Sequence, residues 1–186
     1  MRIIAGQWRG RALKSPEGDA TRPTADRVRE ALFSMLTSRL GSFEGLRVLD
    51  LFAGTGALGL EALSRGADHV TFVETNRMAL NALTANIAGL GAGGRTNIIA
   101  QSAETLGRAP RPCHLLLLDP PYGSGLAGPA LTRAFDQGWI APHAMISIET
   151  GKGESVSAAG FDAEAPRAHG KAWLHLLRAD AAPDSH

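Results

Sequence analysis

From Leu46 onward, short apolar runs alternate with stretches of helical periodicity, and this alternation is the strongest constraint on the fold. The expected order is strand 47–52, helix 56–65, strand 69–74, helix 76–89, strand 96–101, a short helix at 103–107, strand 114–119, helix 126–138 and strand 143–149. Strands that are each followed by a helix return to the same edge of a sheet. The pattern therefore predicts an α/β fold whose mostly parallel sheet is covered by helices on both faces.

The C-terminal part departs from this alternation. Two further strands are expected near 160–165 and 172–178, with a turn near 167–170 and no helix between them. We expect these strands to add an antiparallel hairpin to the sheet, which then has seven strands. Residues 181–186 are small and polar, which is typical of a flexible tail.

The N-terminal part also stands apart. Residues 2–14 are typical of a short β-hairpin. Residues 24–40 carry apolar side chains at helical spacing, with Thr24 as a candidate N-cap. A chain of 186 residues fits one domain with a small addition. We therefore expect an appendage over 1–40 and a main domain over 41–180.

Composition excludes several classes of protein. The single cysteine, Cys113, allows no intrachain disulfide and favours a reducing, cytoplasmic location. No apolar run approaches the length of about 18 residues that a membrane span needs, and no secretory signal is recognisable. The histidines show no metal-ligand spacing, so no metal is expected.

Charge is unevenly distributed along the chain. Residues 1–40 hold eight Lys or Arg against four Asp or Glu, a local balance of +4, whereas the whole chain has a net charge of only +1. A basic segment on a mildly acidic body favours contact with a polyanion. A solvated face without a ligand is the alternative, and charge alone does not separate the two.

A glycine-rich turn follows the first strand of the main domain. The segment 54–59 matches G-x-G-x-x-G, and Glu74 lies 20 residues after Gly54. This spacing fits both a dinucleotide site and an S-adenosylmethionine site, because both ligands offer ribose hydroxyls to a carboxylate. Asp50 lies within the strand and would repel a pyrophosphate but attract the ammonium of a methionine moiety. The chain also lacks a second half-sheet for nicotinamide, so S-adenosylmethionine is favoured.

The residues expected at this cofactor follow the ends of four strands, where ligands bind in doubly wound sheets. Ser102 has two open interpretations, a contact with the adenine amino group or the N-cap of a short helix. The expected cofactor-binding residues in this region are Asp50, Ala53, Gly54, Thr55, Gly56, Glu74, Thr75, Ser102, Ala103 and Asp119.

The second motif is Asp119-Pro120-Pro121-Tyr122, directly after an apolar strand. The prolines cannot donate backbone hydrogen bonds and form a stiff turn. The Asp119 carboxylate and the Pro120 carbonyl are expected to accept the two hydrogens of a nucleobase amino group and turn its lone pair toward a methyl donor. The carboxylate would stabilise positive charge on the nitrogen, and Tyr122 would stack on the base. We therefore expect Asp119, Pro120 and Tyr122 to be catalytic.

Four segments together resemble one known family, the bacterial 16S rRNA guanine-N2 methyltransferases of the RsmD type. The segments are MRIIAGQWRGR at 1–11, RPTADRVREALF at 22–33, DLFAGTGALGLEA at 50–62 and DPPY at 119–122. The Arg-Pro-Thr segment is the most discriminating, since many amino-methyltransferases share the other motifs. Two parts depart from the family pattern, namely Ser102, where members often carry aspartate, and residues 169–173, which follow the closing strand only loosely.

The resemblance implies a class I methyltransferase fold, S-adenosylmethionine as cofactor and one guanine of 16S rRNA as target, in an assembling or assembled 30S particle. It also implies that residues 22–27, including Thr24, lie near the methionine end of the cofactor. The N-terminal hairpin would grip RNA, and Trp8 could stack on a base because it lies among arginines. The expected RNA-binding residues are Trp8, Arg9, Arg11, Arg22 and Arg27. We expect a monomer.

Three other functions remain open at this stage. An adenine-N6 methyltransferase would use the same Asp-Pro-Pro-Tyr motif on RNA or DNA, but the Arg-Pro-Thr segment and the lack of a target-recognition domain argue against it. A non-catalytic RNA-binding assembly factor could keep the fold, although the intact Asp119, Tyr122, Gly54 and Gly56 argue against lost chemistry. A nicotinamide oxidoreductase is the third alternative.

Overall fold

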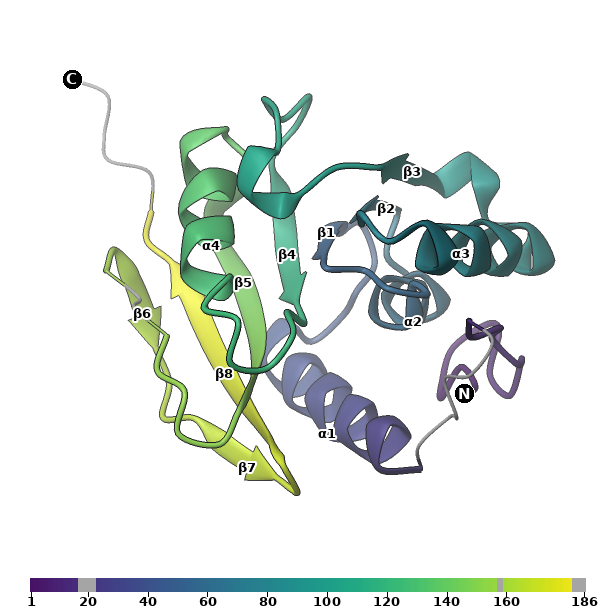
Figure 1. Cartoon of the computed structure of the whole chain (residues 1–186), viewed down its shortest axis with the longest axis horizontal. Helices are drawn as coiled ribbons and strands as arrows, with labels where there is room; N and C mark the ends of the chain where they lie inside the picture. The colour runs from purple at the N-terminus through teal and green to yellow at the C-terminus, as the bar shows by residue number, and fades with distance from the viewer. Residues whose placement is uncertain (17–22, 157–158, 182–186) are drawn as a thin grey trace.

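A twisted sheet with helices on both faces organises the computed structural model, which describes residues 1–16, 23–156 and 159–181 (Figure 1). The strand order is β3-β2-β1-β4-β5-β8-β6, and β7 also pairs with β8. The strands are β1 (Arg47–Leu51), β2 (His69–Val73), β3 (Thr96–Ile99), β4 (Cys113–Leu118), β5 (Ile140–Gly151), β6 (Phe161–Ala163), β7 (Arg167–His169) and β8 (Ala172–Ala179). The helices are α1 (Pro23–Leu40), α2 (Ala57–Ser64), α3 (Arg77–Leu90) and α4 (Ala127–Asp136), with 3-10 turns η1 (Gly93–Arg95) and η2 (Ala103–Thr105).

The expected α/β architecture is confirmed. Strands β1 to β5 run parallel to their neighbours, whereas β8 is antiparallel to β5, β6 and β7. The chain order reverses between β1 and β4, which creates the switch point where ligands bind in such sheets. None of the helices in the described ranges combines the length and the apolar character needed to cross a membrane.

Alternate side chains of the central strands belong to two hydrophobic clusters, one on each face of the sheet. On β4, Leu115 and Leu117 join the cluster under α1, α2 and α3, whereas Leu116 and Leu118 join the cluster under α4 and η2. Strand β4 is covered on both faces and has no solvated side, which explains why its sequence is a continuous apolar run. Trp139 lies in the second cluster and is fully buried.

Most boundaries lie within three residues of expectation, and two parts of the chain differ in kind, the start of α1 and the turn before β8. Helix α1 begins at Pro23, so Thr24 lies within its first turn and not at an N-cap, because proline suits the first helical position. The helix ends at Leu40, before Gly41 with its positive φ. The expected turn at 167–170 is partly a strand, since β7 continues the position of β6 along β8. The sheet therefore has eight strands in seven positions, and Pro166 lies where the last position is interrupted.

The N-terminal hairpin is reduced to one isolated antiparallel bridge between Arg2 and Ala12. Between these residues the chain reverses in turns, because backbone groups of the segment bond to helix α2 and not only to each other. Ile3 and Leu13 are buried in the same cluster as Leu32 of α1 and Val48 of β1. The division of the chain at residue 40 thus stays a prediction, while the structure gives both parts a shared core.

Glu61 of α2 anchors this N-terminal segment. It is fully buried, and its two carboxylate oxygens accept the N–H groups of Ile4 and Ala5 at 2.8 and 3.0 Å. The Arg65 guanidinium lies 2.9 Å from Glu61 Oε1, and the buried Arg29 of α1 lies 3.9 Å from Oε2. A carboxylate can be buried at low cost only with such partners. Glu61 therefore ties the N-terminal segment and α1 to the sheet through α2.

We expect Glu61→Ala to lower the free energy of unfolding by about 3–5 kcal/mol, because it removes one of the two carboxylates beside the buried Arg29, the other being Asp26, and leaves two backbone N–H groups unpaired. Urea titration followed by circular dichroism measures this loss. Glu44→Ala is the matched control, since Glu44 is exposed and should change stability by less than about 0.5 kcal/mol. Equal stability of the two variants would contradict the anchoring role.

Candidate active site

Strand register brings four positions together near the carboxyl edge of the sheet. Leu51 pairs with Val73 on one side and Leu118 on the other, and Leu118 pairs with Ile148. The residues that follow these four, Phe52, Glu74, Asp119 and Glu149, therefore emerge side by side. Three of them are acids. The expectation that Glu74 and Asp119 converge at the carboxyl edge agrees with this register, and Glu149 joins them.

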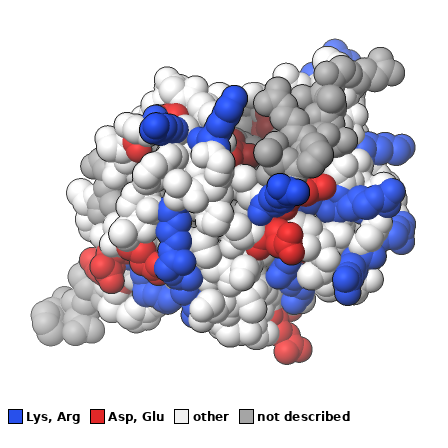
Figure 2. Space-filling view, turned by 90° about the horizontal axis from the view of Figure 1, so that it is seen from below, with Lys and Arg blue, Asp and Glu red and all other residues white. Residues whose placement is uncertain are grey.

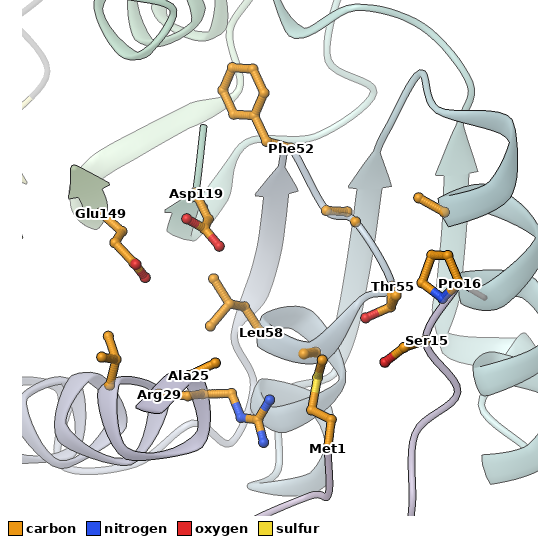
Figure 3. A pocket seen from close by; sticks show the side chains of 15 residues that line it. Met1, Ser15, Pro16, Ala25, Arg29, Phe52, Thr55, Leu58, Asp119 and Glu149 are labelled. Carbon is orange, nitrogen blue, oxygen red and sulfur yellow. The ribbon is translucent and has the colours of Figure 1, made fainter. Parts of the chain in front are cut away.

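Two adjoining hollows open at this edge, and both are lined by Phe52, Gly54, Asp119 and Glu149. The first has a volume of about 340 Å³ and lies between the sheet edge, helix α1 and the N-terminal segment. Figure 3 shows Asp119 and Glu149 pointing into it from the strands, with Arg29 on the α1 side and Met1 and Ser15 opposite. The further residues lining the first hollow are Pro16, Ala25, Val28, Ala53, Thr55, Ala57, Leu58 and Ala79.

The second hollow has the features expected of an adenosine subsite. It combines apolar side chains with a carboxylate and hydroxyl groups, which suits a base with an attached sugar. Its lining adds Val73, Glu74, Thr75, Asn76, Gln101, Ser102, Ala103, Pro120, Pro121, Tyr122 and Leu126 to the shared residues. Sequence reasoning had placed Glu74, Thr75, Ser102 and Ala103 here, and the structure brings all four to this hollow.

The glycine-rich turn is shaped by backbone conformation and by close packing. Gly54 and Gly56 have positive φ, which only glycine adopts at little cost. At Gly59 a Cβ atom would lie 2.4 Å from a ring carbon of Phe72, so glycine lets α2 pack directly on β2. Ala53, Gly54 and Thr55 line the first hollow, whereas Gly56 is not among its lining residues and serves the packing of the turn.

Asp50 lies under this turn and not in the hollows. It is fully buried, and its Oδ2 accepts the Gly59 N–H at 2.9 Å, which holds the start of α2 against β1. Among the residues that the structure describes, its Oδ1 has no hydrogen-bond partner. Burial, helped by the charges of Asp119 and Glu74, raises the pKa of Asp50 to about 8. The expected contact of Asp50 with an ammonium group stays a prediction.

Glu74 is already engaged with the backbone. Its Oε2 accepts the Gly54 N–H at 2.7 Å, and its Oε1 accepts the N–H groups of Thr75 and Asn76. A carboxylate has about four lone-pair sites, so room remains for a hydroxyl group. Ser102 caps η2 by accepting the Glu104 N–H at 3.2 Å, which agrees with its interpretation as an N-cap. Ser102 also lines the second hollow.

Glu149 is the residue that sequence reasoning missed. It lies beside Asp119 at the end of the neighbouring strand, and the Tyr122 hydroxyl donates to its Oε1 at 2.5 Å. Desolvation and the charge of Glu149 raise the pKa of Asp119 to about 7, and desolvation also raises the pKa of Glu149. Glu149 could have been found by the same criterion as Asp119, because both are acids at the carboxyl end of a predicted parallel strand.

The Asp-Pro-Pro-Tyr turn is held open toward the hollow. Glu154 accepts the N–H groups of Gly123 and Gly151 at 2.9 and 2.8 Å, which ties the turn to the end of β5. Within the described residues no hydrogen bond reaches the Pro120 carbonyl. Tyr122 is 50% exposed, so part of its ring can still contact a ligand. The result is a fixed group of acceptors with an aromatic side chain beside it.

The residues expected at RNA have different environments. Figure 2 shows Lys and Arg side chains gathered on the side of the molecule that carries the N-terminal segment and α3. Arg9, Arg11 and Arg27 are exposed, and the Arg11 guanidinium donates to the Gly89 carbonyl at 2.7 Å. Trp8 is half-buried with the Arg95 guanidinium 5.3 Å from its ring centroid, so one face of the ring is already covered.

Two of the expected site residues lie where the structure gives no side-chain description. Arg22 falls in the segment 17–22, outside the described residues, and of Thr24 only the place in the first turn of α1 is given. Their expected contacts with RNA and with the cofactor stay predictions. The neighbouring Ala25, Val28 and Arg29 of α1 do line the first hollow.

Comparison with known proteins gives consistent matches over nearly the whole chain. The family model described as "Conserved hypothetical protein 95" matches residues 1–177. "Ribosomal RNA small subunit methyltransferase D" of Escherichia coli K12 is 41% identical over 150 residues, which cover 81% of this chain and 74% of that protein.

Solved structures agree with this. A putative methyltransferase, yhhF, from Escherichia coli superposes with a TM-score of 0.84 at 37% identity, covering 97% of this chain and 98% of that one. Magnesium protoporphyrin IX methyltransferase from Synechocystis, solved with bound SAM, has a TM-score of 0.66 at 13% identity over 88% of this chain and 87% of that one, which shows the fold alone. The fold is that of the class I methyltransferases.

The raised pKa of Asp119 predicts a pH-dependent effect on stability. Its pKa is about 7 in the folded chain against an ordinary value of 3.8, so folding becomes less favourable as the pH rises through this interval. We expect Asp119→Asn to raise the free energy of unfolding at pH 8 by about 1 kcal/mol, the size left after solvent screening in an open hollow. The gain should vanish toward pH 4.

Thermal unfolding between pH 4 and pH 8 measures the difference. Asp68→Asn removes a charge from an exposed position without an ion pair and is the control that should show no such trend. A gain for Asp119→Asn that stays constant over the whole range would contradict the electrostatic cause.

Proposed function

Because this chain belongs to the RsmD-type family of ribosomal RNA methyltransferases, we propose that it transfers a methyl group from S-adenosylmethionine to the exocyclic N2 of a guanine in 16S rRNA. The observation that carries the proposal is the set of carboxylates around one cavity at the switch point of the sheet. Asp119 and Glu149 line both hollows, Glu74 lines the second, and Asp50 lies beneath them.

The residues present fit this cofactor. Asp50 has an unpartnered buried oxygen, and within the described residues neither Asp119 nor Glu149 forms an ion pair with a basic side chain. Such a cavity favours a cationic ligand and repels a pyrophosphate, which disfavours the dinucleotide alternative. When bound, S-adenosylmethionine supplies an electrophilic methyl group on a positively charged sulfur.

Each end of the cofactor has residues that would hold it. Glu74 would accept from a ribose hydroxyl, and Thr75, Ser102 and Ala103 would surround the adenine. The glycine turn at Gly54 and Thr55, with Asp50 below it, would receive the methionine end. Arg29 is the basic residue among the described lining of the first hollow, and it would face the methionine carboxylate.

The chemistry that remains for the protein is alignment and charge stabilisation. The amino group of a nucleobase is a weak nucleophile, because its lone pair is delocalised into the ring. The Asp119 carboxylate and the Pro120 carbonyl would accept its two hydrogens and turn the lone pair toward the methyl group. Asp119 would also stabilise the positive charge that develops on nitrogen. The proton is then lost easily, and no strong base is needed.

The target base must leave its stack to enter this cavity. Tyr122 would contact the base with the exposed part of its ring while its hydroxyl holds Glu149. The basic N-terminal surface, with the exposed Arg9 and Arg11, would bind the surrounding phosphates. Trp8 is better suited to support this surface than to stack on a base, because Arg95 already covers it. We propose that the protein acts in the cytoplasm as a monomer on 30S particles.

The two RNA alternatives predict different products. An adenine-N6 methyltransferase would leave the guanine unmodified, and a non-catalytic assembly factor would transfer no methyl group. Incubating the purified protein and labelled S-adenosylmethionine with 30S particles from cells that lack the protein distinguishes all three. Digestion to nucleosides should show N2-methylguanosine as the labelled product, and its absence would refute the proposed function.

A pair of variants separates chemistry from cofactor binding. We expect Asp119→Ala to lower turnover by at least about a hundredfold with nearly unchanged cofactor affinity, because it removes a charge-stabilising acceptor. We expect Glu74→Ala to weaken cofactor binding by about 1.5–3 kcal/mol, because it removes charge-assisted hydrogen bonds. Turnover assays and calorimetric titration with S-adenosylmethionine measure both. If the two variants show the same pattern, the assigned division of roles is wrong.

We expect the double variant Arg9→Ala, Arg11→Ala to bind 30S particles more weakly and with a flatter salt dependence, by a slope of about 0.7–0.9 per lost phosphate contact. Filter binding across a salt series measures this, with cofactor titration beside it. The double variant Arg108→Ala, Arg111→Ala removes equal charge from exposed positions before β4, away from the carboxyl edge, and should keep the native slope. Identical slopes for both pairs would place the RNA surface elsewhere.

A further inference from the structure

Glu149 is held in one orientation at the target-base side of the cavity. Its Oε1 accepts the Tyr122 hydroxyl at 2.5 Å, and the same tyrosine belongs to the turn that carries Asp119 and Pro120. No hydrogen bond reaches Glu149 Oε2 within the described residues, and no ion pair neutralises this carboxylate there. One oxygen is therefore fixed by the turn, and the other remains available at the cavity that both hollows share.

The distance between Glu149 and Asp119 is set by the sheet. Leu118 pairs with Ile148, so the two acids follow directly from neighbouring parallel strands, which lie about 4.8 Å apart. Figure 3 shows both carboxylates directed into the same cavity. Two acceptors at this spacing lie within the span of one base edge. A guanine whose N2 amino group reaches Asp119 can therefore place its N1 close to Glu149.

The ring nitrogen beside the amino group differs between the bases. In guanine, the N2 amino group lies between N1, which carries a hydrogen and is a donor, and N3, which has a lone pair. In adenine and cytosine, the ring nitrogen next to the amino group has a lone pair and no hydrogen. A carboxylate oxygen accepts from the first arrangement and is repelled by the second. The set of acceptors formed by Asp119, Pro120 and Glu149 therefore matches the three N–H groups of guanine N1 and N2.

On this basis we propose that Glu149 determines the specificity for guanine, by accepting the N1–H of the target base through the oxygen that Tyr122 leaves available. The inference rests on the proposed function and adds the residue that selects the base. A site built around such a hydrogen bond strongly rejects analogues that lack the donor, because its own acceptor is then left unpaired. Asp119 alone cannot make this distinction, since every amino-bearing base satisfies it.

The test compares guanine with 2-aminopurine, which keeps the amino group at C2 but has a lone pair at N1. The target position is first mapped with the wild-type protein, and 30S particles are then reconstituted with 16S rRNA that carries guanine or 2-aminopurine there. The wild-type protein should prefer guanine by at least about a hundredfold in kcat/KM. Similar rates on the two particles would overturn the inference without any variant.

Glu149→Gln sharpens the test. Glutamine keeps the length and one acceptor for the Tyr122 hydroxyl but places an NH₂ group where the second oxygen was. This group opposes the N1–H of guanine and suits the lone pair of 2-aminopurine, so the preference for guanine should fall by about ten- to a hundredfold. The missing O6 of 2-aminopurine affects both proteins and cancels in the comparison. An unchanged preference in a folded variant would overturn the inference.

Glu154→Gln is the matched control, because Glu154 neighbours the same turn but lines neither hollow. It should keep the wild-type preference, which shows that loss of a nearby negative charge is not sufficient. Calorimetry should give wild-type cofactor affinity for both variants. Failure of the wild-type protein to methylate the guanine particle would refute the proposed function, and this outcome is distinct from methylation without base discrimination.

Discussion

The repulsion among carboxylates at the carboxyl edge of the sheet is the constraint on which the site depends. Asp50, Glu74, Asp119 and Glu149 come together because β1, β2, β4 and β5 run parallel and in register, and not because they stabilise one another. Burial is the main cause of the raised pKa values of Asp50 and Asp119, and the charges of neighbouring carboxylates add to it. The rest of the fold must hold the acids in place, and a cationic ligand relieves the repulsion.

The supports of this edge are distinct for each acid. Gly59 at the start of α2 donates to Asp50, three backbone N–H groups donate to Glu74, and Tyr122 donates to Glu149. These three acids are thus oriented by a neighbouring loop or helix start, which is how a preorganised site keeps its geometry without a ligand. Asp119 has the least support of the four, which suits an acceptor whose partner is the target base.

The N-terminal segment has a structural role besides the expected contact with RNA. Through Glu61 and the buried Arg29 it is fastened to α2 and α1, and its residues Met1 and Ser15 form a wall of the first hollow. The proposed RNA surface and one wall of the first hollow are then parts of one segment.

Much of the fold and part of the candidate site could be predicted from the sequence, because these features depend on residues that lie close together along the chain. The order of strands and helices follows from apolar periodicity, and the positions of Gly54, Glu74 and Asp119 at the carboxyl edge follow from their places after predicted strands. The end of α1 before Gly41 and the buried run of β4 depend on residue types within a few positions. The family follows from contiguous motifs, because each of them can be recognised without knowledge of the tertiary contacts.

Other features were decided only by tertiary contacts between distant segments. Glu149 became part of the site through its pairing neighbour on β4 and through Tyr122, 27 positions earlier in the chain. Arg95 packs on one face of the Trp8 ring from a distant part of the chain, and Glu61, 57 positions after Ile4, binds the backbone of the N-terminal segment. The sequence by itself determined which elements form and which strand ends carry acids. The tertiary structure decided which of those acids share a cavity and which of their atoms remain available, because register and packing depend on the whole chain.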